Sequence, residues 1–157
     1  MRYVTLTDEQ RRGLNYSDKQ HISHQIRLVM QAIGKPNTEI EFMTGDLTIL
    51  CFDRHKLAGF IHILPEANFY EGTIRQAHAN EMYVDYIAVA PQYQKQHIAT
   101  NLYMLSVLEL EKQNAESLKA VLVDEYSRRA FEKTAETRQK SLTKVDSCCT
   151  ETIHIRQ

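Results

Sequence analysis

One continuous stretch, residues 81–114, constrains the fold of this chain more than any other. Residues 81–90 are rich in tyrosine, valine and isoleucine, which is typical of a β-strand. Pro91 ends that strand, because proline cannot donate to a sheet ladder, and a short polar loop follows. From 97 to 114 apolar residues recur at helical spacing. This order predicts a strand–loop–helix unit of an α/β protein.

The remaining chain supplies more elements of both kinds. The apolar run at 118–123 predicts a strand buried on both faces. The two strands around the turn at 54–56 predict a hairpin. We expect an α/β (α+β) fold with a central mixed sheet flanked by helices, in a single domain spanning 1–157. Predicted strands cover 1–5, 46–53, 57–64, 118–123 and 150–156; predicted helices cover 17–33 and 126–137, with a capping box at Thr7 and Gln10.

Composition excludes several classes of function. The 19 basic and 20 acidic residues nearly cancel, so no nucleic-acid partner is indicated. No window approaches the ~18 apolar residues of a membrane span, and the N-terminus lacks the pattern of a signal peptide. Three cysteines without a framework spacing predict reduced thiols and a cytoplasmic location. His21 and His24 share a helix face without a third ligand nearby, so no metal site is expected.

The loop after Pro91 has the character of a phosphate-binding turn. Its backbone N–H groups can surround a diphosphate, and the following helix adds a partial positive charge at its N-terminus. Lys95 can supply a full positive charge. Neither a Walker A motif nor a glycine-rich dinucleotide fingerprint occurs, so a nucleoside triphosphatase is not indicated.

This loop resembles the signature of the GCN5-related N-acetyltransferases (GNAT), Gln/Arg-x-x-Gly-x-Gly/Ala. The matching run is Gln94-Lys95-Gln96-His97-Ile98-Ala99. The flanks are similar too: the strand end at 87–89, Pro91, Tyr93, Thr100 and Leu102. The hairpin at 47–64 resembles the family's central antiparallel strands, and the strand at 118–123 and the helix from 126 resemble the next two elements. The N-terminal helices and the last 20 residues match by position only.

The resemblance implies a cofactor, a reaction and a set of contacts. The cofactor would be acetyl-CoA, in a wedge between two parallel strands, and transfer to a primary amine would be direct. The N–H of Ile87 would stabilise negative charge on the acetyl oxygen. Expected cofactor contacts are Ile87, Ala88, Val89, Gln94, Lys95, Gln96, His97, Ile98, Ala99, Thr100, Ser127 and Phe131.

Candidates for the proton transfers follow from the same resemblance. Tyr83, Asp85 and Ile87 alternate on one face of the predicted strand. The family often places a base two or four residues before the oxyanion position, which here means Asp85 or Tyr83. Asp85 is the better base, through water, or else a structural hydrogen-bond acceptor.

Two positions depart from the family pattern. His97 stands where glycine is usual; with right-handed helical angles it would point to solvent, and otherwise it could contact phosphate. Phe131 stands where a tyrosine often protonates the departing thiolate, and a phenyl ring has no proton to donate. Tyr126 or solvent would then serve as the acid, and Phe131 would contact the cofactor or the core.

These departures keep two alternatives open. One is an acyl-CoA-binding or sensing protein with reduced or lost catalysis. The other is an interaction protein whose wedge is closed, which would not bind CoA. The amine acceptor, a small molecule or a protein, has no signature in the sequence, although we expect its contacts on the helix at 17–33, the 65–80 loop and the last strands. The oligomeric state is also left open, a homodimer included.

Overall fold

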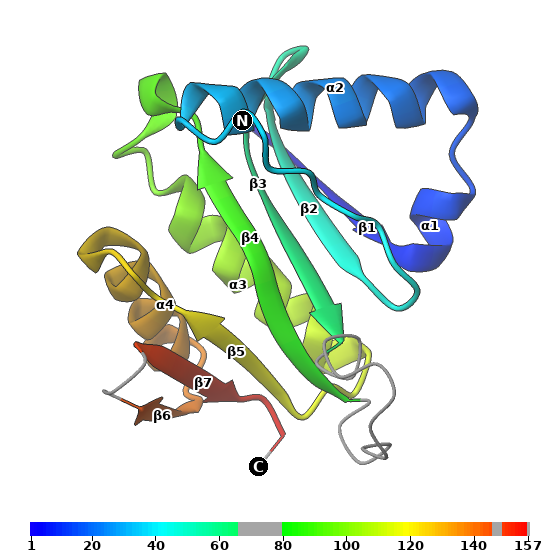
Figure 1. The fold of residues 1–157 in the computed structure, drawn as a ribbon. Coiled ribbons are helices and arrows are strands. Elements are labelled where there is room, and N and C mark those ends of the chain that lie inside the picture. The colour runs from blue at the N-terminus through cyan, green and yellow to red at the C-terminus, as the bar shows by residue number, and fades with distance from the viewer. Residues whose placement is uncertain (66–79, 146–148, 157) are drawn as a thin grey trace. The chain divides into compact units, whose positions relative to one another are not determined.

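The computed structural model describes residues 1–65, 80–145 and 149–156. Its described strands form a seven-stranded mixed sheet in the order β1-β2-β3-β4-β5-β7-β6 (Figure 1). The chain divides into two compact units: the first holds Met1–His62 and Tyr86–Leu102, and the second holds Ile63–Asp85 and Tyr103–Gln157. The elements are β1 (Arg2–Thr7), α1 (Asp8–Arg12), α2 (Tyr16–Ala32), β2 (Leu47–Asp53), β3 (Lys56–Pro65), β4 (Glu81–Val89), the short 3₁₀ helix η3 (Pro91–Tyr93), α3 (Ile98–Lys112), β5 (Ser117–Val121), α4 (Glu125–Thr137), β6 (Ser141–Val145) and β7 (Thr150–His154).

In the first unit, helix α2 packs its apolar face on strands of the sheet. Asn15 caps the helix by accepting the N–H of Asp18 at 2.8 Å. Gly34 follows the helix with a φ of 83°, a left-handed angle that glycine adopts at little cost. The buried side chains of this core are Leu6, Ile26, Val29, Met30, Leu50, Phe52, Leu57, Phe60 and Ala88.

A buried ionic network in the same unit joins α1 to the strands. Asp46, 3% exposed, accepts a hydrogen bond from Nε2 of the fully buried His62 at 3.0 Å. Arg11 donates to Asp46 at 3.0 Å and to Asp8 at 2.9 Å. Burial acts to raise the pKa of Asp46, but hydrogen bonds from His62 and the Met43 N–H, with the charge of Arg11, outweigh it and lower that pKa. The carboxylate of Asp46 is therefore held ionised inside the fold.

In the second unit, three strands and the first residues of β4 form the sheet beneath α4. The parallel ladder between β4 and β5 runs from Glu81↔Ser117 to Tyr83↔Lys119. Strand β7 pairs antiparallel with β5 on one side and with β6 on the other. The buried face of α4 presents Ala130, Phe131, Thr134 and Ala135.

The predicted burial of the 118–123 strand on both faces is wrong. Leu118, Ala120 and Leu122 are buried, whereas Val121 is 45% exposed and Val123 is 84% exposed. Apolar residues therefore occupy both faces of β5 although only one face meets the core. Exposed valines remain compatible with a strand because β-branched side chains suit the extended backbone.

Most predicted elements are present in the structure. The predicted hairpin is β2 and β3, neighbours joined by the turn at 54–55, and the capping box is formed by Thr7 and Gln10. Strand β6 was not predicted, because its five residues include only two apolar ones and most of them are exposed. The predicted 65–80 loop lies almost entirely outside the described residues. No helix in the described part of the chain is long and apolar enough to cross a membrane.

Candidate functional site

The candidate site lies in the first unit, where β4 ends and α3 begins. The N–H of Ala90 donates to the carbonyl of Ala58 at 2.8 Å, which is the last bond that ties this segment to the strand beside it. Pro91 then opens η3, whose turn is closed by the Tyr93 N–H on the Ala90 carbonyl at 2.9 Å. The proline break predicted from the sequence thus separates strand from helix.

Two residues of the loop have left-handed backbone angles. Lys95 has a φ of 65° and His97 a φ of 61°. Such angles cost a non-glycine residue about 1–2 kcal/mol, because its β-carbon approaches the following carbonyl. The condition of right-handed angles, under which His97 would be easily tolerated, is therefore not met. Left-handed residues in a loop can also turn successive N–H groups toward a common point, an arrangement that binds anions.

The N–H groups of residues 95–100 are the main chemical feature of this junction. Within the described residues, none of these six groups donates a hydrogen bond to a protein atom, and the first helical bond runs from the Asn101 N–H to the His97 carbonyl at 3.0 Å. The other described α-helices have side-chain caps, namely Thr7 on α1, Asn15 on α2 and Asp124 on α4. The first turn of α3 also carries no acidic residue. Main-chain donors and the helix dipole together make an anion site.

Gly59 on β3 lets the start of α3 pack closely against the strand end. A β-carbon at this position would lie 2.8 Å from the Ala88 carbonyl oxygen and 3.3 Å from a methyl carbon of Ile98. Real β-carbons do not come that close to backbone atoms, so only glycine fits without a shift. A glycine within a predicted strand is a weak signal for a close approach of another backbone. Only the fold shows which segments approach Gly59.

The predicted site residues fall into two groups in the structure. Residues 87–89 and 94–100 lie in the first unit on consecutive elements, with Ala88, Ile98 and Ala99 buried. Tyr83 and Asp85 are half-buried on the part of β4 that belongs to the second unit. Tyr126, Ser127 and Phe131 lie on α4 in the second unit.

Tyr103 of α3, which was not among the predicted site residues, lies beside Phe131 of α4. The ring of Phe131 is fully buried and meets the ring of Tyr103 edge-on, with centroids 5.2 Å apart. The hydroxyl of Tyr103 is 2.8 Å from the Oγ of Ser127, and burial raises the pKa of Tyr103 to about 12. Phe131 is thus a core residue of this unit, whereas Tyr126 is 49% exposed. A helical tyrosine on an apolar face gives no sequence signal beyond core packing.

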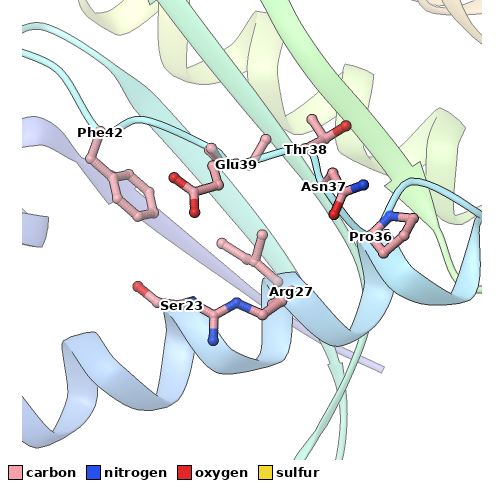
Figure 2. A pocket seen from close by; sticks show the side chains of 9 residues that line it. Ser23, Arg27, Pro36, Asn37, Thr38, Glu39 and Phe42 are labelled. Carbon is pink, nitrogen blue, oxygen red and sulfur yellow. The ribbon is translucent and has the colours of Figure 1, made fainter.

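A groove of about 360 Å³ runs beside α2, also within the first unit. Figure 2 shows Ser23 and Arg27 on the helix, with Glu39 and Phe42 on the segment opposite. Among the described residues neither Arg27 nor Glu39 forms an ion pair, so both charges are available to a ligand. Asn37 and Thr38 add an amide and a hydroxyl to the lining.

Several solved structures are similar to this chain in fold. GCN5 from Tetrahymena has 15% sequence identity and a TM-score of 0.64, covering 99% of this chain and 97% of that one. Diaminobutyrate acetyltransferase EctA from Paenibacillus lautus, in complex with L-2,4-diaminobutyric acid and coenzyme A, has 13% identity and a TM-score of 0.62, with coverage of 99% and 97%. The CoA-dependent acyl-homoserine lactone synthase BjaI, with SAM and isopentyl-CoA, has 10% identity and a TM-score of 0.64, with coverage of 98% and 82%. At these identities the likeness shows the fold alone.

The sequence profile of the Acetyltransferase (GNAT) family matches residues 20–135, well over half of the chain. The protein therefore belongs to the GNAT family. No curated protein matches its sequence.

Proposed function

We propose that this protein is an N-acetyltransferase that moves an acetyl group from acetyl-CoA directly to a primary amine. The observation that carries this proposal is the set of N–H groups at 95–100 that have no partner among the described residues, in a chain of the GNAT family. An uncapped helix start after a strained loop serves no evident purpose in packing, but it matches the negative charge of a diphosphate. The alternative, binding or sensing of acyl-CoA with reduced or lost catalysis, uses the same site and differs only in turnover.

The donor's contacts follow from the chemistry of the junction. The pyrophosphate would accept hydrogen bonds from the N–H groups of residues 95–100, with the ammonium of Lys95 adding a full charge. The absence of acidic residues from the first turn of α3 supports this placement. The pantetheine arm would run along the backbone of residues 87–89.

The chemistry assigned to this chain consists of charge stabilisation and proton transfer. Acetyl-CoA supplies the activated thioester, so a C–N bond to the amine forms as the C–S bond breaks. The N–H of Ile87 would stabilise the negative charge on the acetyl oxygen. Asp85, or else Tyr83, would take the ammonium proton through water, and Tyr126 or solvent would protonate the thiolate.

Binding is tested by calorimetry with acetyl-CoA. Ala99 is buried in the first turn of α3, so Ala99→Leu should displace that turn and weaken binding. Ala32→Leu makes the same change at an exposed position of the first unit and should leave the affinity unaltered. Equal affinities for wild type and Ala99→Leu would count against the site. Tight binding without turnover on a panel of primary amines would favour the sensing alternative.

Catalysis is tested at Asp85. If its carboxylate takes the amine proton, Asp85→Asn should lower kcat by about 10²- to 10⁴-fold at neutral pH. Raising the pH should restore part of the rate, because more of the amine is then already neutral. A variant rate equal to wild type at every pH would assign Asp85 to structure and leave Tyr83 as the candidate base.

The α2 groove is where we place the recognition of the acceptor. Its Glu39 carboxylate, which forms no ion pair with any described residue, attracts a cationic amine, and the helix at 17–33 was expected to contact the acceptor. Glu39→Gln should raise the acceptor KM several-fold and leave the acetyl-CoA KM unchanged. Glu41→Gln removes a neighbouring exposed carboxylate outside the groove and serves as the control.

We place the reaction in the cytoplasm on the cysteine content alone.

A further inference from the structure

Two side-chain hydrogen bonds tie the segment from η3 to the first turn of α3 to strands β1 and β2, one near each end. At the first end, the hydroxyl of Tyr93 donates to Oδ2 of Asp53 at 2.8 Å. At the second end, the amide of Asn101 donates to the hydroxyl of Tyr3 at 3.0 Å. All four residues belong to the first unit. We call these two bonds the loop clamp.

Both acceptors of the loop clamp lie on one face of paired strands. Tyr3 of β1 is directly opposite Cys51 of β2 in the antiparallel register. Cys51 and Asp53 are two positions apart in β2, so their side chains share a face with Tyr3. A hydrogen bond also links Tyr3 to the thiol of the buried Cys51. The two anchors are thus fixed to each other by the ladder and do not move independently.

Between the two bonds lies the strained, unbonded part of the loop. Lys95 and His97 have left-handed angles there, and the N–H groups of 95–100 have no partner among the described residues. Strained backbone persists only where its surroundings hold it in place. The bonds of η3 end at the N–H of Gln94, and beyond it the amide of the Gln94 side chain donates to the Val89 carbonyl at 3.4 Å. The loop clamp adds the two bonds that tie this segment to β1 and β2.

We infer that Tyr93, Asp53, Asn101 and Tyr3 are positioning residues, which set the affinity for the diphosphate end of the acyl donor without touching it. This inference rests on the proposed function, because it names how the proposed anion site is kept in shape. A pre-formed set of donors avoids the cost of ordering the loop when the ligand binds.

The test compares two ligands that differ in the diphosphate. CoA contains it, and pantetheine is the thiol-bearing arm without it. Tyr93→Phe removes only the hydroxyl, and Asn101→Ala removes the second bond. Each variant should weaken CoA binding by about fivefold, the scale of one hydrogen bond, and the pair should exceed either alone. Pantetheine binding should change by less than about twofold in every variant.

Tyr16→Phe is the matched control, because it removes a hydroxyl from an exposed tyrosine of the same unit. It should alter binding of neither ligand. Equal weakening of CoA and pantetheine by Tyr93→Phe would show a general loss of fold and overturn the inference. Unchanged CoA affinity in the double variant would overturn it as well, while leaving the proposed function standing. Failure of the wild type to bind CoA would overturn both.

Discussion

His97 illustrates how a residue can adopt a backbone conformation that its side chain disfavours. Its φ of 61° is one that glycine adopts freely and histidine adopts at a cost. The side chain is exposed, so the cost lies in the backbone and not in packing. The sequence could identify the unusual residue from its motif position, but the sign of φ depends on the whole strand–loop–helix geometry.

His97→Gly should therefore raise stability, or at least not lower it. Relief of about 1–2 kcal/mol of strain opposes the roughly 0.5–1 kcal/mol by which glycine's freedom favours the unfolded chain. Gln94→Gly is the control, because Gln94 has a φ of −67° and gains no relief. Urea unfolding should place the His97 variant above the Gln94 variant by about 1 kcal/mol or more. Equal losses in both variants would contradict a left-handed residue at 97.

Phe131 is the second residue whose role depends on its surroundings. The sequence left it as a contact either with the cofactor or with the core, because motif position alone does not reveal burial. The structure places its ring in full burial against Tyr103, whose hydroxyl is already paired with Ser127.

Phe131→Tyr should accordingly lower stability, because a new hydroxyl would enter an apolar core. An unpaired buried hydroxyl costs about 1–3 kcal/mol in proteins. Tyr126→Phe, at a residue 49% exposed, should stay within about 0.5 kcal/mol of wild type. Thermal melts of the two variants give the comparison. A Phe131→Tyr protein as stable as wild type would mean that the hydroxyl finds a partner.

At the scale of elements, sequence periodicity predicted the helices and strands whose apolar faces pack against a core. It missed a strand that is mostly exposed. Helix α2 and strands β2 and β3 were predicted to within a few residues because their apolar faces meet a core. Strand β6 escaped notice because its main stabilisation is the antiparallel ladder to β7, which leaves no hydrophobic pattern. Strand β5 carries apolar residues on an exposed face, so its pattern overstated its burial.

The contact between β3 and the start of α3 gives an element-scale prediction. Gly59→Ala would place a β-carbon 2.8 Å from the Ala88 carbonyl oxygen of β4 and 3.3 Å from a methyl carbon of Ile98 in α3, so β3 must shift away from both. The variant should lose about 1–3 kcal/mol of stability and bind CoA more weakly than wild type.

Gly13→Ala is the matched control for this change. Its β-carbon would come no closer than 3.5 Å to any neighbouring atom, and its φ is −77°. The same substitution there should be neutral or stabilise by about 0.4–1 kcal/mol. Denaturant unfolding and CoA titration of both proteins separate steric displacement from the general effect of losing a glycine. Similar behaviour of the two variants would contradict close packing at Gly59.

Across the whole chain, the division into two units could not be read from the sequence, because β3, β4 and α3 each contribute residues to both. The buried network of Asp46 was also invisible, since the positions of Arg11 and His62 along the chain do not suggest contact. Ionic groups far apart in sequence become partners only through topology, whereas the phosphate-type loop was readable because its parts are consecutive.

That network predicts how global stability depends on acid. The folded pKa of Asp46 lies below its ordinary value, so its contribution is fully present above the unfolded pKa and is lost as pH falls through the folded one. The free energy of unfolding should therefore drop on acidification below about pH 4. The Asp46→Asn variant should be less stable than wild type at neutral pH, and its free energy of unfolding should fall less steeply on acidification. Asp18→Asn, at an exposed aspartate, should keep the wild-type slope.

The donors at 95–100 belong to the main chain, and this has a consequence for how the protein tolerates sequence change. Substituting a side chain leaves the peptide N–H in place, so most amino-acid substitutions in this segment would keep the same main-chain hydrogen-bond donors. Proline is the exception, since it alone lacks the N–H. The proposed anion site would therefore keep its donors when its side chains change, as His97, which retains its N–H where the family motif has glycine, illustrates.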